Sequence, residues 1–350
     1  MIVDLVLKAL IAMAPVLLLL LVFDRLDVFN LIPMRDIALL VLAGSGLALV
    51  GYFANWQVSE GFPIPWDPYT RYVAPVIEES VKAIPIVLLF NRNRLGFKLD
   101  AAIAGFAVGA GFSMAENAWY LFRLATETNV TDWLVRGFGT AVMHGACTAL
   151  FAVIAHEMLE KQSESSAAQY SFKPLAFAPG LLVAIVIHSG FNHFSSQPLL
   201  AMALVLLLAP LTLFLTLARS ERATRQWLVA DAAAHRQILA DIRGARFAES
   251  KIGGALRHDL RGLKTIDPAD VLAFVELKVE LVLRAEELIL ASQEGAAASA
   301  GEAEREKFER LDALEKRLGR SVVAAVESRV GFTRNDLYEL GRLRASLRAR

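Results

Sequence analysis

The sequence predicts an all-α fold: a polytopic membrane helix bundle of about seven transmembrane helices, followed by a C-terminal cytoplasmic helical domain. Three observations favour this fold class. Of the 350 residues 55% are hydrophobic, and the mean hydropathy of +0.46 is too high for a soluble globular protein. The apolar residues form long runs of about 20 residues rather than alternating faces. The last third is instead rich in Arg, Glu and Ala.

Seven apolar segments are each long enough to cross the roughly 30 Å hydrocarbon layer of a bilayer as a helix. The N-terminal segment lacks the strong positive region and the small-residue cleavage site of a signal peptide, so we interpret it as the first span. The expected spans are Leu5–Phe23, Ile37–Ala54, Tyr72–Phe90, Leu99–Phe122, Trp133–Met158, Pro174–Phe194 and Leu199–Ala218.

Lys and Arg residues are concentrated in alternate loops between these spans, as is typical of cytoplasmic loops. The other loops are nearly free of them, with Arg71 as the main exception. The residues of the first, third and fifth loops and of the segment after the last span are Arg25, Arg35, Arg92, Arg94, Lys98, Lys161, Lys173, Arg219, Arg222 and Arg225. The sequence therefore predicts a multi-pass protein of the cell membrane with its N-terminus outside and its C-terminus in the cytoplasm.

Residues 1–218 form the expected membrane-embedded domain, and residues 219–350 the expected cytoplasmic helical tail. The tail pattern predicts helices over Ser220–Lys251, Asp267–Ala291 and Glu302–Val330, a linker at Gln293–Gly301, and a last helix capped by Thr333 and Asp336. Several apolar positions of the tail need a partner surface. They are Val271, Phe274, Val275, Leu277, Val279, Leu281 and Leu283. A hairpin within the chain or a coiled coil with a second copy, making a homo-oligomer through the tail, would each supply it.

Charge and cysteine content exclude some functions. There are 36 Lys and Arg against 36 Asp and Glu, so the zero net charge gives no support for a nucleic-acid partner. The single cysteine, Cys147, excludes an intrachain disulfide and is interpreted as a buried inert thiol. The tail has no clustered His or Cys and no Gly-rich phosphate loop, so we expect it to regulate or recruit rather than to catalyse.

The third span carries three ionisable residues inside an apolar helix: Glu78, Glu79 and Lys82. Buried charge is costly in a bilayer, so intramembrane ionisable residues usually mark function. Lys82 lies four residues after Glu78 and three after Glu79, so it can reach back to either carboxylate. A salt bridge that only allows the helix to insert is the alternative interpretation.

Three further spans carry polar residues. The fourth contains Glu116 and Asn117 after the pair Gly105 and Gly109, whose GxxxG spacing lets the helix approach its neighbours closely. The fifth has polar residues at four-residue spacing: Arg136, Thr140, His144 and Thr148. The sixth has His188 and Asn192 one turn apart, whereas His193 and the fifth-span residue His156 are expected to be structural.

The depth of these residues links them. At about 1.5 Å per residue, Glu78 and Glu79 lie roughly 10 Å below the outer end of their span. Glu116 and His188 reach a similar level from the outer ends of their own spans, and His144 lies somewhat deeper. Unrelated buried polar residues would scatter in depth, so we predict one polar, water-accessible site in the outer half of the membrane. A transport pathway would also gather such groups.

These motifs resemble the PrsW family of intramembrane proteases, which belongs with the CAAX-prenyl endoprotease and bacteriocin-processing superfamily. The resemblance covers about the first 220 residues and rests on Glu78-Glu79-x-x-Lys82, Phe112-x-x-x-Glu116-Asn117, His144 and His188-x-x-x-Asn192. The wider superfamily has His at the position of Glu116, so that role does not transfer directly, although His144 could compensate. The resemblance implies an intramembrane endopeptidase that cleaves a membrane-anchored protein, similar to an anti-sigma factor, near the extracytoplasmic face.

Peptide hydrolysis needs water, a base and donors for the oxyanion. We expect Glu78 or Glu79 to deprotonate the water, His144 or Glu116 to orient it or move its proton, and His188 with Asn192 to stabilise the oxyanion. Lys82 and Asn117 take supporting positions. The alternative is a zinc-dependent form of the same protease, for which the candidate ligands are Glu79, Glu116, His144 and His188, although an HExxH motif is absent.

Two other functions compete with proteolysis. A proton-coupled transporter or channel would carry polar residues through to the cytoplasmic face, but the inner halves of these spans are mostly apolar. A signalling scaffold would act through the tail. Cleavage by a chain without the tail would separate this scaffold from a protease.

Overall fold

The computed structural model describes residues 2–26, 32–164, 174–244, 246–260, 267–293 and 300–348. These residues form helices and no strand, which confirms the all-α fold class. By their contacts they divide into two units. The membrane unit lies within residues 1–160 and 172–221, and the tail unit within residues 161–171 and 222–350.

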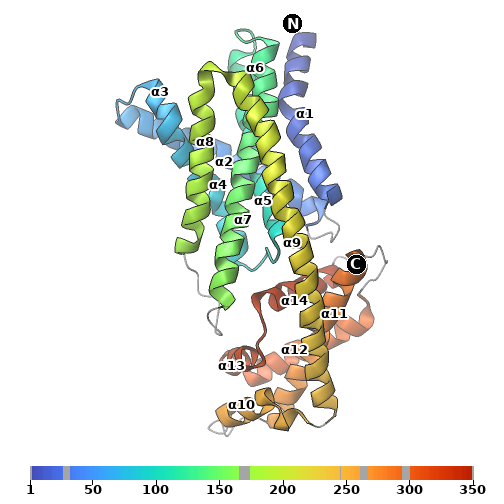
Figure 1. Cartoon of the computed structure of the whole chain (residues 1–350). Coiled ribbons are helices and arrows are strands. Elements are labelled where there is room, and N and C mark those ends of the chain that lie inside the picture. The colour runs from blue at the N-terminus through green and yellow to red at the C-terminus, as the bar shows by residue number, and fades with distance from the viewer. Residues whose placement is uncertain are drawn as a thin grey trace. The chain divides into compact units, whose positions relative to one another are not determined.

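The long helices of the membrane unit match the expected spans, and α1, α7, α8 and the first part of α9 run lengthwise along it (Figure 1). Within the described residues, six segments are long and apolar enough to cross a membrane. The remaining expected span, Tyr72–Phe90, is also helical. It differs from the other six because it contains three ionisable residues, Glu78, Glu79 and Lys82. The helices are α1 (Ile2–Leu26), α2 (Met34–Gly61), α4 (Ala74–Asn91), α5 (Lys98–Leu124), α7 (Ala141–Glu164), α8 (Ala178–His193) and α9 (Pro198–Arg243).

Burial separates the centre of the unit from its outside. In α5 and in the span that contains α7, 78% of the apolar segment is buried inside the protein. The buried share is only 22% in α2 and 11% in the first part of α9. Large apolar side chains such as Leu49, Leu182 and Leu207 are exposed on the outer helices, as expected of surfaces that face lipid. The polar residues of α5 and α7 therefore lie at the centre of the bundle.

The GxxxG pair of α5 packs directly on the backbone of α7. A Cβ atom added to Gly109 would lie 2.3 Å from the carbonyl oxygen of His144, and one added to Gly105 would lie 2.5 Å from that of Thr148. Any side chain at either position would push the helices apart. The predicted close approach is confirmed, and it fixes the backbone at His144.

Two π-helical turns were not predicted. One, Tyr69–Val73, follows the short helix α3 (Trp66–Pro68) and leads into α4. The other, Val135–Thr140, joins the short helix α6 (Val130–Leu134) to α7, where the sequence predicted one regular helix. Each inserts an extra residue into a turn just before a helix that carries site residues, and such turns often occur at functional sites.

The tail unit differs from expectation at two helix boundaries. No helix begins at Ser220, because α9 runs on to Arg243. The expected helix Glu302–Val330 is broken at Gly319, whose φ of +79° is strained for any residue with a side chain. The remaining helices are α10 (Lys251–Leu260), α11 (Pro268–Gln293), α12 (Glu302–Leu318), α13 (Arg320–Val330) and α14 (Arg334–Arg348). Most of the expected linker, residues 294–299, lies outside the described residues.

The apolar positions of α11 are covered within the chain. Phe274, Val275, Val279 and Leu281 are fully buried in a core shared with α9, α12, α13 and α14. Of the two partner surfaces that the sequence allowed, the structure shows the one within the chain. The predicted cap of the last helix is also present, since the amide N–H of Thr333 donates to Asp336 Oδ2 at 2.6 Å.

Candidate active site in the membrane unit

Four buried side chains from α4, α7 and α8 form a connected polar chain. The Lys82 ammonium donates to Glu79 Oε1 at 2.5 Å and lies 2.8 Å from His144 Nδ1. His188 Nδ1 lies 2.7 Å from the same oxygen of Glu79. The relative exposure of these side chains is at most 4%. Glu79 therefore neutralises Lys82 and fixes one face of the His188 ring.

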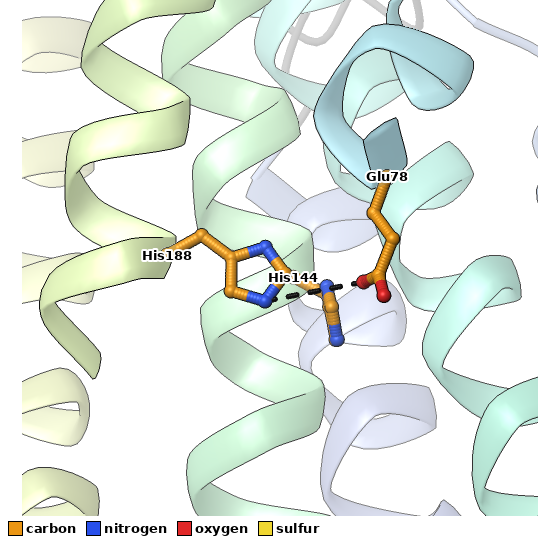
Figure 2. Close-up of side chains that lie close together, drawn as sticks. All are labelled: Glu78, His144 and His188. Atoms are coloured by element: carbon orange, nitrogen blue, oxygen red, sulfur yellow. Dashed lines mark ion pairs between the residues drawn. The ribbon is translucent and has the colours of Figure 1, made fainter. Parts of the chain in front are cut away.

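Glu78 points to the opposite side of His188. Its Oε2 lies 3.9 Å from His188 Nε2, and its Oε1 accepts a hydrogen bond from Asn55 Nδ2 at 3.2 Å. Figure 2 shows Glu78, His144 and His188 converging from three helices, and the two imidazole rings meet edge to face with centroids 4.8 Å apart. Lys82 pairs with Glu79 alone, so the two adjacent carboxylates have different environments.

Glu116 enters the cluster from α5. Its Oε2 lies 3.2 Å from His144 Nε2 and 3.4 Å from Arg136 Nη2. This oxygen and Arg136 Nη2 are both buried and make no hydrogen bond. Glu116 Oε2 therefore contacts two basic groups without an ideal hydrogen bond to either, which leaves it able to bind a ligand or a proton.

Asn117 and Tyr120 position Arg136. The Asn117 side chain accepts a hydrogen bond from Arg136 Nε at 2.9 Å and donates to the carbonyl of Ala12 in α1 at 3.0 Å. The guanidinium carbon lies 3.8 Å from the centroid of the Tyr120 ring, an arrangement that stabilises the cation. Asn117 thus supports the site through Arg136.

Asn192 does not join the cluster. Its side-chain amide donates to the carbonyl of Thr70 at 2.8 Å, and the hydroxyl of Ser189 donates to that of Arg71 at 2.6 Å. Both bonds hold the π-helical turn that precedes α4. Asn192 therefore helps to fix the start of the helix that carries Glu78 and Glu79.

Three residues that the sequence predicted to be structural, His156, His193 and Cys147, make contacts outside the polar cluster. His156 Nε2 lies 2.7 Å from the carbonyl of Gly96, and His193 contacts the hydroxyl of Tyr72 at 3.0 Å. Cys147 is buried beside Met143, with its sulfur 3.6 Å from the methionine sulfur. Thr148 donates to the carbonyl of His144 at 3.1 Å and so stays within its own helix.

The sequence interpretation missed Asn55 and Tyr69. The Tyr69 hydroxyl donates to Asn55 at 2.9 Å, and Asn55 in turn donates to Glu78. Both residues lie near helix ends, where polar residues are common, so only their positions in space reveal their role. The roles of Arg136 and Tyr120 were likewise not visible in the sequence.

Glu78, His144 and His188 have the composition of a metal site. One ligand atom from each lies within 4.8 Å of the others. Two imidazoles and one carboxylate, with a position left for water, are the donors of a hydrolytic zinc site. The contact of Glu79 with His188 Nδ1 is the carboxylate–histidine support that metal-binding histidines usually have. These donors, with the Glu116 carboxylate beside them, fit a divalent metal ion. Glu79, one of the ligands expected from the sequence, is occupied by Lys82 and His188.

Fold and site together define a multi-pass membrane protein with a buried polar centre shared by four helices. The profile of the family described as PrsW family intramembrane metalloprotease matches residues 33–217, more than half of the chain. The chain belongs to this family, which confirms the resemblance seen in its motifs. It is an intramembrane protease, a hydrolase of peptide bonds whose substrates are membrane proteins. Comparison with curated proteins gave no match, and neither did comparison with solved structures.

Proposed function

We propose that proteolysis takes place at the cluster of Glu78, Glu116, His144 and His188, and that it depends on zinc. The observation that carries this proposal is the convergence of Glu78, His144 and His188 from three helices, with ligand atoms within 4.8 Å of one another. When bound, zinc would polarise the peptide carbonyl and make the attacking water more acidic. The protein would bind the ion through these three side chains.

Glu79 and Lys82 act as positioning residues. Glu79 accepts a hydrogen bond from the N–H group at His188 Nδ1. The other ring nitrogen, Nε2, is then free to act as a ligand on the side of Glu78. Lys82 offsets the charge of Glu79 and, since an ammonium group can only donate, His144 Nδ1 accepts from it. The polar chain thus sets the ring orientation of both histidines.

Glu116 is the proposed proton acceptor. With Nδ1 accepting from Lys82, a neutral His144 carries its proton on Nε2, which faces Glu116 Oε2 at 3.2 Å. Ligation through Nε2 requires the other tautomer of the neutral ring, in which Nδ1 takes the proton of Lys82 and the Nε2 proton is released to water. Glu116 Oε2 would accept the proton of the attacking water.

Arg136 is the proposed donor to the oxyanion. Its Nη2 is buried without a hydrogen bond, 3.4 Å from Glu116, while Nε and the ring of Tyr120 hold the guanidinium in place. This assignment differs from the sequence-based one, which gave the base to Glu78 or Glu79 and the oxyanion to His188 and Asn192. Glu79 has two partners already, and Asn192 is bound to Thr70.

We further propose that cleavage occurs near the extracytoplasmic face, on a membrane-anchored protein similar to an anti-sigma factor. The excess of Lys and Arg in alternate loops supports an N-terminus outside and a C-terminus in the cytoplasm. In this orientation the cluster lies in the outer half of the bilayer. Residues 1–218 would carry catalysis, and residues 219–350 would regulate it or recruit substrate.

The test uses the purified full chain in detergent and a single-span protein that accumulates in cells lacking the protease. We expect Glu116→Gln to lower cleavage by about 10²–10⁴-fold, because the proton acceptor is lost, while the metal content is unchanged. His188→Gln should lose both metal and activity. Glu60→Gln, an exposed carboxylate of α2, is the matched control. Cleavage at the wild-type rate by well-folded Glu116→Gln would remove this residue from the chemistry. Wild-type activity in chelator-treated, metal-free protein would exclude zinc.

A further inference from the structure

The tail unit contains a second buried cluster, made by residues of three helices. Asp231 and His235 lie one turn apart on α9, Glu286 is on α11, and Asp336 is on α14. One ligand atom from each lies within 4.8 Å of the others. His235, Glu286 and Asp336 are buried, and both carboxylates have a relative exposure of 0%. The sequence interpretation missed this cluster, because its members lie far apart along the chain.

His235 is at the centre of the cluster. Its Nδ1 lies 2.8 Å from Glu286 Oε1, and its Nε2 lies 4.0 Å from Asp336 Oδ2. Asp336 Oδ2 also accepts the helix-capping hydrogen bond from the Thr333 amide. The imidazole therefore has a carboxylate on each side, and each of these carboxylates has a second oxygen to be satisfied.

Those second oxygens have no hydrogen bond of ordinary geometry, although Asp231 and Asp336 lie close enough to share a proton. Asp231 Oδ2, Glu286 Oε2 and Asp336 Oδ1 are buried and unsatisfied, as are both oxygens of the neighbouring Glu339. Glu339 has a relative exposure of 0% and is electrostatically coupled to Glu286 and Asp336. A buried carboxylate oxygen without a partner costs on the order of 1–3 kcal/mol or more, so five of them around one point need an explanation.

The charges of the cluster are not balanced by the protein. Four carboxylates face His235, Arg236 and Arg342, which leaves a formal charge of −1 even with the imidazole protonated. Burial and the neighbouring Asp231 raise the pKa of Asp336 to about 7. Burial and Glu286 raise the pKa of Glu339 well above its usual value. The site has too little positive charge.

We propose that Asp231, His235, Glu286 and Asp336 bind a divalent transition-metal ion, with Glu339 as an adjacent carboxylate that orients a ligand or completes the coordination. One imidazole and several carboxylate oxygens suit Zn²⁺, Mn²⁺ or Fe²⁺. Ligands at about 2.0–2.2 Å from one tetrahedral ion lie about 3.3–3.6 Å apart, so ligand atoms within 4.8 Å of one another would move closer together when the ion binds.

The site would join three helices of the tail unit. Its ligands come from α9, α11 and α14, whose apolar residues share one core. An ion bound to the folded tail, but not to the unfolded one, stabilises the fold in proportion to its concentration. The stability of the tail would then depend on the supply of a divalent metal. This inference does not depend on the proposed mechanism in the membrane unit.

The test compares the full-length protein in detergent, stripped by chelator, with the same protein after addition of Zn²⁺ or Mn²⁺. Hydrogen exchange of the tail peptides that contain Asp231, Glu286 and Asp336 reports on this site and not on the membrane cluster. We expect at least one of the two ions to slow exchange by about tenfold or more. The wild type should also hold about one more ion per chain than His235→Gln.

Two variants complete the design. Glu286→Gln removes one buried charge, so in stripped protein we expect it to fold as well as the wild type, but to gain no protection from metal. Glu309→Gln, an exposed carboxylate of α12, should behave as the wild type. The inference is overturned if neither ion changes exchange in the wild type, or if His235→Gln and Glu286→Gln keep the full metal content and response. In that case protons shared among the carboxylates satisfy the cluster.

Discussion

The membrane cluster and the tail cluster use the same kinds of side chain but balance their charges differently. In the membrane unit, Lys82 and Arg136 lie among the carboxylates, and Glu79 makes contacts of 2.5 and 2.7 Å to Lys82 and His188. In the tail unit, four carboxylates surround one histidine, and five of their oxygens have no hydrogen bond. The first cluster is therefore ordered by its own charges, whereas the second would be completed by the proposed ion.

This difference indicates different roles. A catalytic centre needs ligand rings and proton acceptors fixed in advance, since misplacement by about 1 Å can cost on the order of 10²-fold in rate. The internal cations of the membrane cluster provide this order and leave one carboxylate oxygen, on Glu116, without a hydrogen bond of ordinary geometry. The tail cluster joins helices, so an ion can supply both the charge and the geometry.

The largest effect that would separate the two clusters is expected from Glu79→Gln. The change leaves Lys82 as a buried charge without its carboxylate, which should cost about 3–5 kcal/mol of stability. It also weakens the support of His188, which should lower metal affinity in the membrane unit by about 10–100-fold. Thermal unfolding and metal content of the purified protein measure the two effects.

The double variant Glu79→Gln/Lys82→Met tests the cause. Removing both charges should restore most of the stability but not the metal affinity, because the support of His188 stays weakened. Equal stability of Glu79→Gln and the wild type would show that Glu79 does not balance Lys82, and the contrast between the clusters would then be lost.

A smaller effect is expected from Gly109→Ala in α5. The added Cβ would lie 2.3 Å from the carbonyl of His144, so α7 must move and displace the His144 ring. Overpacking of this kind costs about 1–3 kcal/mol, and cleavage should fall with it. Gly46→Ala in α2 is the matched control, because a Cβ there meets nothing within 4 Å. Full activity of Gly109→Ala would mean that the close approach does not position His144.

The sequence was sufficient to predict that polar residues of the membrane unit lie close together, but not that residues of the tail do, for a physical reason. Glu78, Glu79, Glu116 and His188 stand out because a charge inside an apolar span is costly and therefore rare. Helical periodicity and depth then bring them to one level. In the tail, a carboxylate such as Glu286 lies among many solvated charges, and nothing in the sequence distinguishes it from the half-buried Glu287 next to it.

Finer details of the membrane site also required the structure. The spacing of Lys82 allowed a pair with either carboxylate, and the choice of Glu79 follows from the contacts of both residues with α7 and α8. The pattern of Asn192 suggested a role in catalysis, but the π-helical turn at Tyr69–Val73 brings the Thr70 carbonyl to it instead. Such turns insert a residue without a clear sequence signal, so the positions of side chains near them cannot be read from periodicity.

The smallest expected effect is the pH dependence of the tail without metal. The pKa of Asp336 is raised to about 7, and burial raises the pKa of Glu286. Burial alone would lower the pKa of His235, but its hydrogen bond to Glu286 raises it. A group with a raised pKa binds more protons in the folded state, so its stabilisation is lost as the pH rises through the folded pKa. In chelated protein, the folding stability of the tail should therefore fall by on the order of 1 kcal/mol between about pH 5 and pH 8.

Hydrogen-exchange protection factors of the tail peptides measure this loss of stability. The variant Asp336→Asn should reduce the loss, whereas Glu309→Gln should not. With metal present the slope should reverse, because protons compete with the ion for the same carboxylates. A chelated tail that becomes more stable as the pH rises would mean that these carboxylates are already balanced by the protein, as they are in the membrane unit.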